Sequence, residues 1–225
     1  EMSASLVGSE MCIRDRGHTA LPDPRAVDKS VPEYKNPFHP STYAHFVARK
    51  DYRKTYDVYK DDTLLNRKPK KSRKIFVCLD EQRGQYLVDG LIAMDFPLSS
   101  GVKAYPTKTG DYTVISKKED HASNLYGKMY DAEGKCINYN AEATDPVPEG
   151  GRFDGSPMPY WQRLTNAGLG LHVGKVRRHP ISHGCVRLPR NVAEILYKQT
   201  SVGTPVTIQR TPLPVPEAQK APAVQ

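Results

Sequence analysis

Long hydrophobic runs are absent from this 225-residue sequence. No stretch approaches the roughly 18 consecutive apolar residues that a membrane-spanning helix needs, so we expect no stable insertion into a membrane. Cysteine is also scarce, with 4 residues, and their spacing does not indicate the disulfide framework of a small secreted domain. A Cys78–Cys136 disulfide has no support from the spacing. We expect Cys78, within "KIFVCLD", to be a buried thiol on a strand.

Acidic residues are outnumbered, with 25 Asp and Glu against 33 Lys and Arg and a net charge of +8. Such an excess favours an anionic partner, which could be nucleic acid, an acidic polymer or a membrane surface, or it simply keeps the surface solvated. Charge alone does not separate these options. The run "NRKPKKSRK" (residues 66–74) has no interleaved aromatic residues and is interpreted as a solvated loop, so we expect no nucleic-acid partner.

The N-terminal residues do not resemble natural protein sequence. "SLVGSEMCIRDR" (residues 5–16) matches the translation of a sequencing-library adapter, in which ATG TGT ATA AGA GAC encodes Met-Cys-Ile-Arg-Asp. We therefore interpret residues 1–16 as an assembly artefact and exclude them, with Cys12, from the fold. The native N-terminus, with any signal sequence, is then expected to be missing.

The remaining chain divides into three parts by composition. Residues 17–73 are predicted to form an arm or linker with one short helix over 41–54, for which Ser41 would be the N-cap. Residues 74–210 change to short apolar and alternating runs with turn signals between them, which is typical of a folded domain. Residues 211–225 are rich in Pro and Ala and are expected to be a disordered tail.

Short strands dominate the predicted domain. "RGQ" (residues 83–85) is read as the tight turn between the first two antiparallel strand segments, and residues 142–159 are read as a long loop. One clear helix is predicted over residues 189–200. The fold class is therefore mainly β, like a sandwich or barrel, with one or two short helices. The predicted strands are 74–80, 84–101, 110–117, a hairpin over 126–140 with its turn near Glu133-Gly134, 160–165, 168–174 and 204–209.

The chemistry concentrates in "LHVGKVRRHPISHGCVRLP" (residues 171–189), where Cys185 has three competing interpretations. As a zinc ligand it would join His172, His179 and His183, but the spacings match no closed structural zinc pattern. As a buried thiol it would need apolar neighbours, whereas the residues around it are polar, small or charged. The third interpretation, a nucleophile, gives each neighbouring residue a task.

A thiolate that attacks a carbonyl needs a base, donors for the oxyanion and close backbone approach. Nearby arginines and the start of the following helix are expected to lower the pKa of the Cys185 thiol. Gly184 allows the close turn, and its amide together with that of Cys185 can face an oxyanion. His172 or His183 can accept the thiol proton. Arg187 can hold a substrate carboxylate.

The motif "SHGCVRLP" (residues 182–189), with a histidine upstream in "LHVG", resembles the active-site signature of the YkuD-like L,D-transpeptidase catalytic domain family of bacterial cell-wall enzymes. "FPLSSGVKAYPTKTGDYTV" (residues 96–114) and "MPYW" (residues 158–161) resemble further segments of that family in the same order. The resemblance covers about residues 74–209. It implies the mainly β catalytic fold of that family.

The resemblance implies a role for each matched residue. Cys185 is the nucleophile, His172 the general base and His183 a second active-site histidine, with Gly184 in the catalytic turn. Ser182 and Arg187 occupy the remaining motif positions and are expected to bind substrate, as are Tyr160 and Trp161, for which core packing is an equal alternative. Only nine residues separate His172 from Ser182, fewer than in the familiar pattern. Val173 follows His172, so a backbone carbonyl is expected to orient the imidazole, and His179 is expected to be a solvated loop histidine.

The implied reaction is peptidoglycan cross-linking without a metal or organic cofactor. Cys185 would form a thioester with a tetrapeptide stem and release D-alanine, and an amine of a second stem would resolve it to a 3–3 cross-link. The expected partners are donor and acceptor stem peptides, the expected compartment is the periplasm or cell envelope, and a monomer is expected. The alternatives are an L,D-carboxypeptidase or other thiol peptidase, and a wall-binding module that has lost catalysis.

Overall fold

The computed structural model describes residues 23–68 and 72–220 of the chain. The adapter-like residues 1–16 therefore lie outside the described residues, as do part of the basic run and the last five residues. The elements follow one another as α1 (Tyr43–Ala48), β1 (Tyr59–Lys60), α2 (Asp62–Leu65), β2 (Arg73–Cys78), β3 (Arg83–Val88), β4 (Leu91–Pro97), β5 (Gly110–Thr113), β6 (Ser116–Lys118), β7 (Ala122–Tyr130), β8 (Cys136–Glu142), β9 (Arg152–Pro157), β10 (Trp161–Arg163), β11 (Gly170–Val173), β12 (Val186–Leu188), α3 (Arg190–Gln199), β13 (Pro205–Gln209) and the 3-10 helix η1 (Glu217–Gln219).

The predicted fold class is confirmed, because strands dominate and the helices are few and short. The described residues contain three α-helices, one or two more than expected. None of the helices in this part of the chain has the length and hydropathy needed to cross a bilayer.

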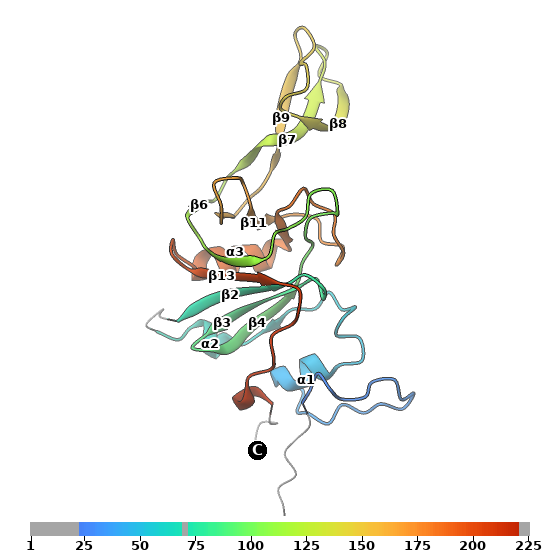
Figure 1. Cartoon of the computed structure of the whole chain (residues 1–225), viewed down its shortest axis with the longest axis vertical. Coiled ribbons are helices and arrows are strands. Elements are labelled where there is room, and N and C mark those ends of the chain that lie inside the picture. The colour runs from blue at the N-terminus through green and yellow to red at the C-terminus, as the bar shows by residue number, and fades with distance from the viewer. Residues whose placement is uncertain (1–22, 69–71, 221–225) are drawn as a thin grey trace, which may run out of the picture.

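A six-stranded sheet with the order β1-β4-β3-β2-β13-β5 lies in the middle of the molecule, between α3 and α1 (Figure 1). β2, β3 and β4 are antiparallel neighbours, whereas β13 runs parallel to β2. The turn between β3 and β4 is Asp89-Gly90, with φ of 50° and 79°, as a two-residue hairpin turn of the Asp-Gly type requires. The prediction of one segment over residues 84–101 missed this turn.

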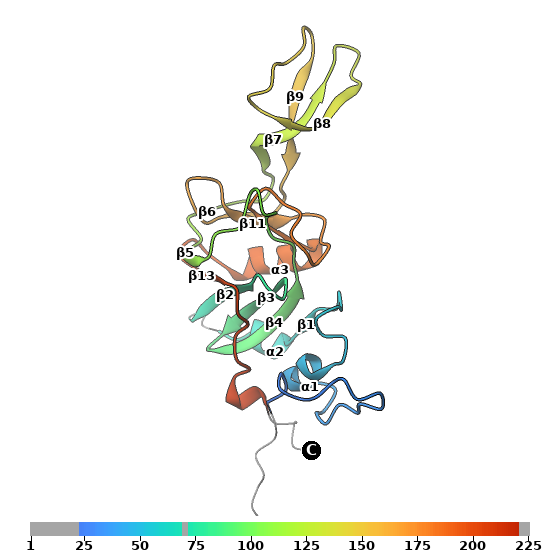
Figure 2. The same cartoon turned by 45° about the vertical axis from the view of Figure 1, so that its right-hand side comes forward.

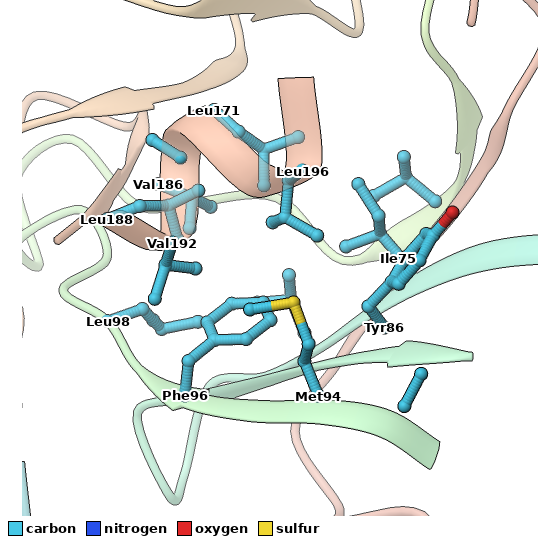
Figure 3. Packing of buried hydrophobic residues seen from close by; sticks show 14 of the residues in the cluster. Ile75, Tyr86, Met94, Phe96, Leu98, Leu171, Val186, Leu188, Val192 and Leu196 are labelled. Atoms are coloured by element: carbon cyan, nitrogen blue, oxygen red, sulfur yellow. The ribbon is translucent and has the colours of Figure 1, made fainter. Parts of the chain in front are cut away.

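The main core lies between that sheet and a layer made of α3 and the four-stranded sheet β12-β11-β10-β6 (Figure 3). Leucine and valine side chains of β11, β12 and α3 face Met94, Phe96 and Leu98 of β4 and the segment after it. The predicted helix over residues 189–200 is confirmed as α3, whose buried side chains Val192, Ala193 and Leu196 lie on one face. This layer holds β11 and β12 against a rigid support.

The opposite face of the six-stranded sheet is covered by the N-terminal arm and the C-terminal segment. Arg83 and Asp95 are fully buried there and form an ion pair of 2.5 Å. The hydroxyls of Tyr43 and Tyr52 both donate hydrogen bonds of 2.8 Å to Asp95 Oδ2. Residues 23–60 are thus packed against the sheet and are not a free linker.

The C-terminal segment differs from its prediction in a similar way. Val215 is buried, and the Gln219 side chain exchanges two hydrogen bonds with the backbone of Ile92. Residues 211–220 therefore pack on β4, although their Pro-rich composition predicts disorder. The rest of the predicted tail lies outside the described residues.

A third sheet, with the order β8-β7-β9, projects from the body (Figure 2). The predicted hairpin is confirmed as β7 and β8, with Gly134 at φ 79° in its turn. β9 lies inside residues 142–159, which were wrongly predicted to be a loop, because Pro and Gly flank a strand whose two faces are both largely exposed.

Three smaller predictions were also wrong. The first helix covers only six residues, and its N-cap is Thr42, whose side chain accepts the His45 amide hydrogen bond, and not Ser41. "RGQ" lies within β3 and is not a turn, since the β2–β3 connection is made by residues 79–82. The predicted strand over 110–117 is split into β5 and β6, which belong to different sheets.

Removing the Asp95 carboxylate is expected to destabilise the domain strongly, because Arg83 would remain buried without a partner. For Asp95→Ala we expect the free energy of unfolding to fall by about 3–5 kcal/mol. Asp154→Ala, which breaks the exposed pair with Arg152, should cost at most about 1 kcal/mol. Urea unfolding followed by circular dichroism measures both, and similar losses for the two variants would contradict the prediction.

Candidate active site

The motif residues are brought together by the parallel pairing of β11 with β12. In its register Leu171 pairs with Val186 and His172 with Arg187. Side chains alternate between the faces of a strand, so Leu171 and Val186 enter the core, while His172 and Arg187 face the other way. Cys185 directly precedes β12 and shares the face of Arg187. His172, Cys185 and Arg187 all line one cavity.

This cavity has a volume of about 670 Å³ and lies between the four-stranded sheet and the projecting sheet. Its walls include Tyr126 on β7, Tyr139 on β8 and Gly168 in the loop before β11. Among the described residues, the cavity lining contains four Lys or Arg side chains and no Asp or Glu: Lys108, Arg163, Lys175 and Arg187. The site therefore suits an anionic ligand.

The turn that carries the thiol is fixed by hydroxyl groups. The Ser182 hydroxyl donates a hydrogen bond of 2.5 Å to the Cys185 carbonyl oxygen and accepts one of 3.2 Å from the Gly184 amide. The Thr107 hydroxyl donates to the Gly184 carbonyl oxygen at 2.6 Å. Gly184 adopts φ 106°, a conformation that favours glycine. The Ser182 hydroxyl thus stabilises the turn through one donated and one accepted hydrogen bond, and the residue also lies in the cavity lining.

Residues 98–102, which follow β4, hold this turn in place through backbone hydrogen bonds. Ser99 and Arg187 exchange backbone hydrogen bonds of 3.1 and 2.8 Å, and the Val102 amide donates to the Ser182 carbonyl at 2.9 Å. A Cβ on Gly101 would lie 2.8 Å from Gly184 Cα, so only glycine allows this approach. The small residues of "LSSG" thus serve to hold the turn of the motif.

His172 is buried and neutral. Its Nδ1 lies 2.7 Å from the carbonyl oxygen of Val173, so Nδ1–H donates there and Nε2 is left as the acceptor. The expected orientation by a backbone carbonyl is confirmed. Burial, with smaller contributions from Arg187 and His121, lowers the pKa of His172 to about 4. Its imidazole is therefore available as a base at neutral pH.

The Cys185 thiol differs from the prediction. Its Sγ donates to the carbonyl oxygen of Gly168 at 3.3 Å, and burial raises the thiol pKa above its usual value despite the opposing effect of Arg187. Nor does Cys185 lie at a helix start, because β12 intervenes and α3 begins at Arg190. The expectation of a lowered pKa and of amides at a helix mouth was therefore wrong, and the resting residue is a thiol.

The structure places the other predicted site residues in different environments. His183 is exposed and stacks on Tyr126, with ring centroids 4.4 Å apart, and lies against Tyr105 at 4.8 Å. Trp161 is buried in the cavity wall, 5.9 Å from His172 between ring centroids. Tyr160 is absent from the described lining of the cavity and instead packs on Tyr197. His179 is exposed in its loop, as expected.

The residues proposed for a zinc site do not converge. Within the described ranges, no group of three or more His, Cys, Asp or Glu side chains is arranged to hold a metal ion. His183 is stacked between tyrosines, and His179 makes its contact with the Arg177 carbonyl oxygen. The arrangement matches a nucleophile and base more closely than a set of ligands.

Several cavity residues carry no signal in the linear sequence. Tyr126 lies on the projecting sheet, far from the motif in the chain, and His121 precedes that sheet. Gly170, which is not in the described lining of the cavity, does carry a signal, because a glycine within a strand indicates close approach by another group. A Cβ on Gly170 would lie 2.5 Å from the Trp161 ring, which covers it.

The state of the thiol can be tested by alkylation. Because the pKa of Cys185 is raised, its thiolate fraction should increase only at alkaline pH, and the rate of reaction with iodoacetamide should rise through pH 9 and beyond with no plateau near neutrality. Intact mass measures this rate in a variant in which Ser replaces the other cysteines. A plateau below pH 7 would instead indicate a thiolate–imidazolium pair.

Comparison with known proteins agrees with this geometry. The sequence profile of the YkuD L,D-transpeptidase catalytic domain matches residues 72–208. The chain is 32% identical over 120 residues to the probable L,D-transpeptidase 3 of Mycobacterium tuberculosis H37Rv, which is 50% of this chain and 38% of that protein. The chain therefore spans well under two thirds of this relative.

Solved L,D-transpeptidases resemble it as well. The enzyme from Mycobacterium smegmatis has 22% identity and a TM-score of 0.47, over 61% of this chain and 58% of that chain. The protein from Stackebrandtia nassauensis has 22% identity and a TM-score of 0.46, over 74% and 65%. Since the profile covers more than half of the sequence, the chain belongs to the L,D-transpeptidase catalytic domain family.

Proposed function

We propose that residues 74–210 form the catalytic domain of a peptidoglycan L,D-transpeptidase that acts through a thioester on Cys185. The observation that carries the proposal is the placement of Cys185, His172 and Arg187 on one sheet face, inside a cavity with cationic but no acidic side chains in its described lining. A stem peptide supplies the carboxylates that such a cavity attracts.

In the first step Sγ of Cys185 attacks the carbonyl of the third residue of a tetrapeptide stem. His172 Nε2 accepts the thiol proton and passes it to the departing amine, so that D-alanine leaves. In the second step an amine of another stem attacks the thioester and gives the 3–3 cross-link. All groups needed for these proton transfers belong to the chain.

Thiol and imidazole are both neutral at rest, so proton transfer accompanies the attack. The raised pKa of Cys185 and the lowered pKa of His172 both disfavour a preformed ion pair. In the tetrahedral intermediate the charge moves to the substrate oxygen, and we assign the Cys185 amide as its backbone donor. The Gly184 amide contributes only if it gives up its 3.2 Å bond to Ser182.

Arg187 is assigned to a substrate carboxylate. It is half-buried and forms no ion pair with any residue that the structure describes, and burial lowers the pKa of its guanidinium. A buried cation without a partner is costly, and a bound carboxylate removes that cost. His183 is assigned to positioning, because its ring is stacked between Tyr105 and Tyr126.

Two alternatives share this site. An L,D-carboxypeptidase would resolve the same thioester with water, and cross-linked dimers separate the two activities. A wall-binding module without catalysis would bind muropeptides but form no acyl-enzyme. A peptidoglycan substrate places the protein in the periplasm or cell envelope, and we propose that it works there as a monomer.

Cys185→Ala is expected to abolish release of D-alanine from purified tetrapeptide muropeptides, since no other thiol lines the cavity among the described residues. His179→Ala, which removes an exposed histidine of the same loop, should keep the wild-type rate. Liquid chromatography with mass detection measures both. Release of D-alanine by Cys185→Ala would falsify the proposal.

Acylation by a β-lactam provides an independent readout, since a related enzyme, LdtMt1, has been solved in complex with imipenem. We expect imipenem to add its mass to Cys185 in the wild type and in His179→Ala, and to add nothing to Cys185→Ala. Intact-mass spectrometry measures the adduct, and an adduct of equal yield on the alanine variant would show that another residue reacts.

The pH dependence should report the buried base. Because His172 must be neutral and its pKa is about 4, kcat/KM should stay level as pH falls through 6.5 and decline only near pH 4, where the imidazole becomes protonated. D-alanine release measured from pH 3.5 to 8 tests this. An acid limb centred near pH 6.5 would identify an exposed histidine such as His183 as the base.

A further inference from the structure

The sheet face that carries the nucleophile and base extends onto two more strands. Next to His172 on β11 lies Trp161 on β10, which pairs with Lys118 on β6. One row across the sheet therefore reads Arg187, His172, Trp161, Lys118.

A second row runs beside the first. Cys185 lies next to Gly170, and Gly170 pairs with Arg163, which in turn pairs with Ser116. With strands about 4.8 Å apart, Arg163 is roughly 10 Å from Cys185 across the sheet. Gly170 has no side chain between them, and the Trp161 ring and the Gln162 carbonyl oxygen lie closest to the position that its Cβ would take.

A second, open groove lies next to Trp161, on the part of the sheet formed by β6 and β10. Lys118, Arg163 and His121 line it together with Ser116 and Asn166, and His121, Trp161 and Arg163 also line the catalytic cavity. The two hollows thus share a wall made of these three residues. Among the residues that the structure describes, the groove lining contains no acidic side chain.

Two cations of the groove, Lys118 and Arg163, have no ion-pair partner among the residues that the structure describes. In the described part of the chain neither Lys118 nor Arg163 forms an ion pair with a carboxylate, including the adjacent Glu119 and Asp120. The other lysine of the groove, Lys117, donates to the carbonyl oxygens of Tyr197 and Thr200. Burial lowers the pKa of His121, and so does the proximity of Lys118 and Arg163, as expected if the three groups converge.

The proton transfers of the proposed reaction determine which groups of the substrate lie on the His172 side of Cys185. The departing amine must take a proton from His172, and the attacking amine must give one to it, so both occupy the His172 side of the thioester. In the first step the S–C bond forms, the C–N bond breaks and the thiol proton ends on the amine. In the second step the new N–C bond forms, the S–C bond breaks and the amine proton returns to sulfur.

We propose that Lys118, Arg163 and His121 form a subsite for the carboxylate of an α-amino acid group, which holds the leaving amino acid in the first step and an attacking α-amino acid amine in the second. The inference rests on the proposed function. A carboxylate one carbon from the reacting amine extends from His172 past Trp161 toward Arg163, where a guanidinium can bind it through two hydrogen bonds.

The test compares two acceptors that differ only in the carboxylate. The acyl-enzyme formed from a tetrapeptide muropeptide is resolved with D-methionine or with D-methioninamide, and the ratio of the two product rates is measured by mass spectrometry. The wild type should favour D-methionine. In the double variant Arg163→Gln/Lys118→Gln this preference should fall by about 10- to 100-fold, as expected for loss of charge-assisted hydrogen bonds.

Controls separate the subsite from fold and from chemistry. Arg163→Lys should restore most of the preference, and Lys74→Gln, at an exposed position of β2, should leave it at the wild-type value. If the double variant is unstable, Lys118→Gln alone should lower the preference, since Lys118 is exposed. An unchanged ratio in a folded double variant would overturn the subsite alone. Absence of any acyl-enzyme in the wild type would overturn the proposed function and the subsite with it.

Discussion

The register between β11 and β12 is the constraint on which both the core and the site depend. It sends Leu171 and Val186 into the core and His172 and Arg187 into the cavity. A shift of one strand by one residue against the other would turn either His172, or Cys185 with Arg187, toward the core. The core therefore disfavours such a shift and keeps His172 and Cys185 on one face, and the hydrogen bonds from Ser99 and Val102 hold the register at the motif.

Burial sets the chemistry of the pair as well as its position. The same desolvation raises the pKa of Cys185 and lowers that of His172, so both groups rest uncharged in a cavity whose described lining holds Lys and Arg side chains and no Asp or Glu. Because the Cys185 sulfur is not a thiolate, it does not neutralise the positive charges of the cavity. These charges therefore remain available to attract an anionic substrate. The projecting sheet contributes to this by covering the site with Tyr126 and Tyr139.

The motif around Cys185 was enough to predict the backbone carbonyl that orients His172, because that contact depends on a neighbour in the chain. The mainly β fold and α3 followed from periodicity. The thiol pKa could not be predicted, since nearby arginines are visible in the sequence whereas burial is not. β9 was missed because both faces of its sheet are largely exposed, which removes the alternation that marks a strand. The row from Arg187 to Lys118 depends on pairing between distant segments, and the packed N-terminal arm depends on a buried partner, Asp95, which no local pattern reveals.

The hydrogen bond from Cys185 to the Gly168 carbonyl has a consequence for the durability of the protein. Peroxides and simple alkylating agents react with thiolates, and a cysteine that stays protonated at rest reacts with them slowly. In the proposed reaction, the substrate displaces this contact before His172 accepts the proton. Selectivity against oxidants thus arises from the resting state of the sulfur and does not require that access to the cavity be closed.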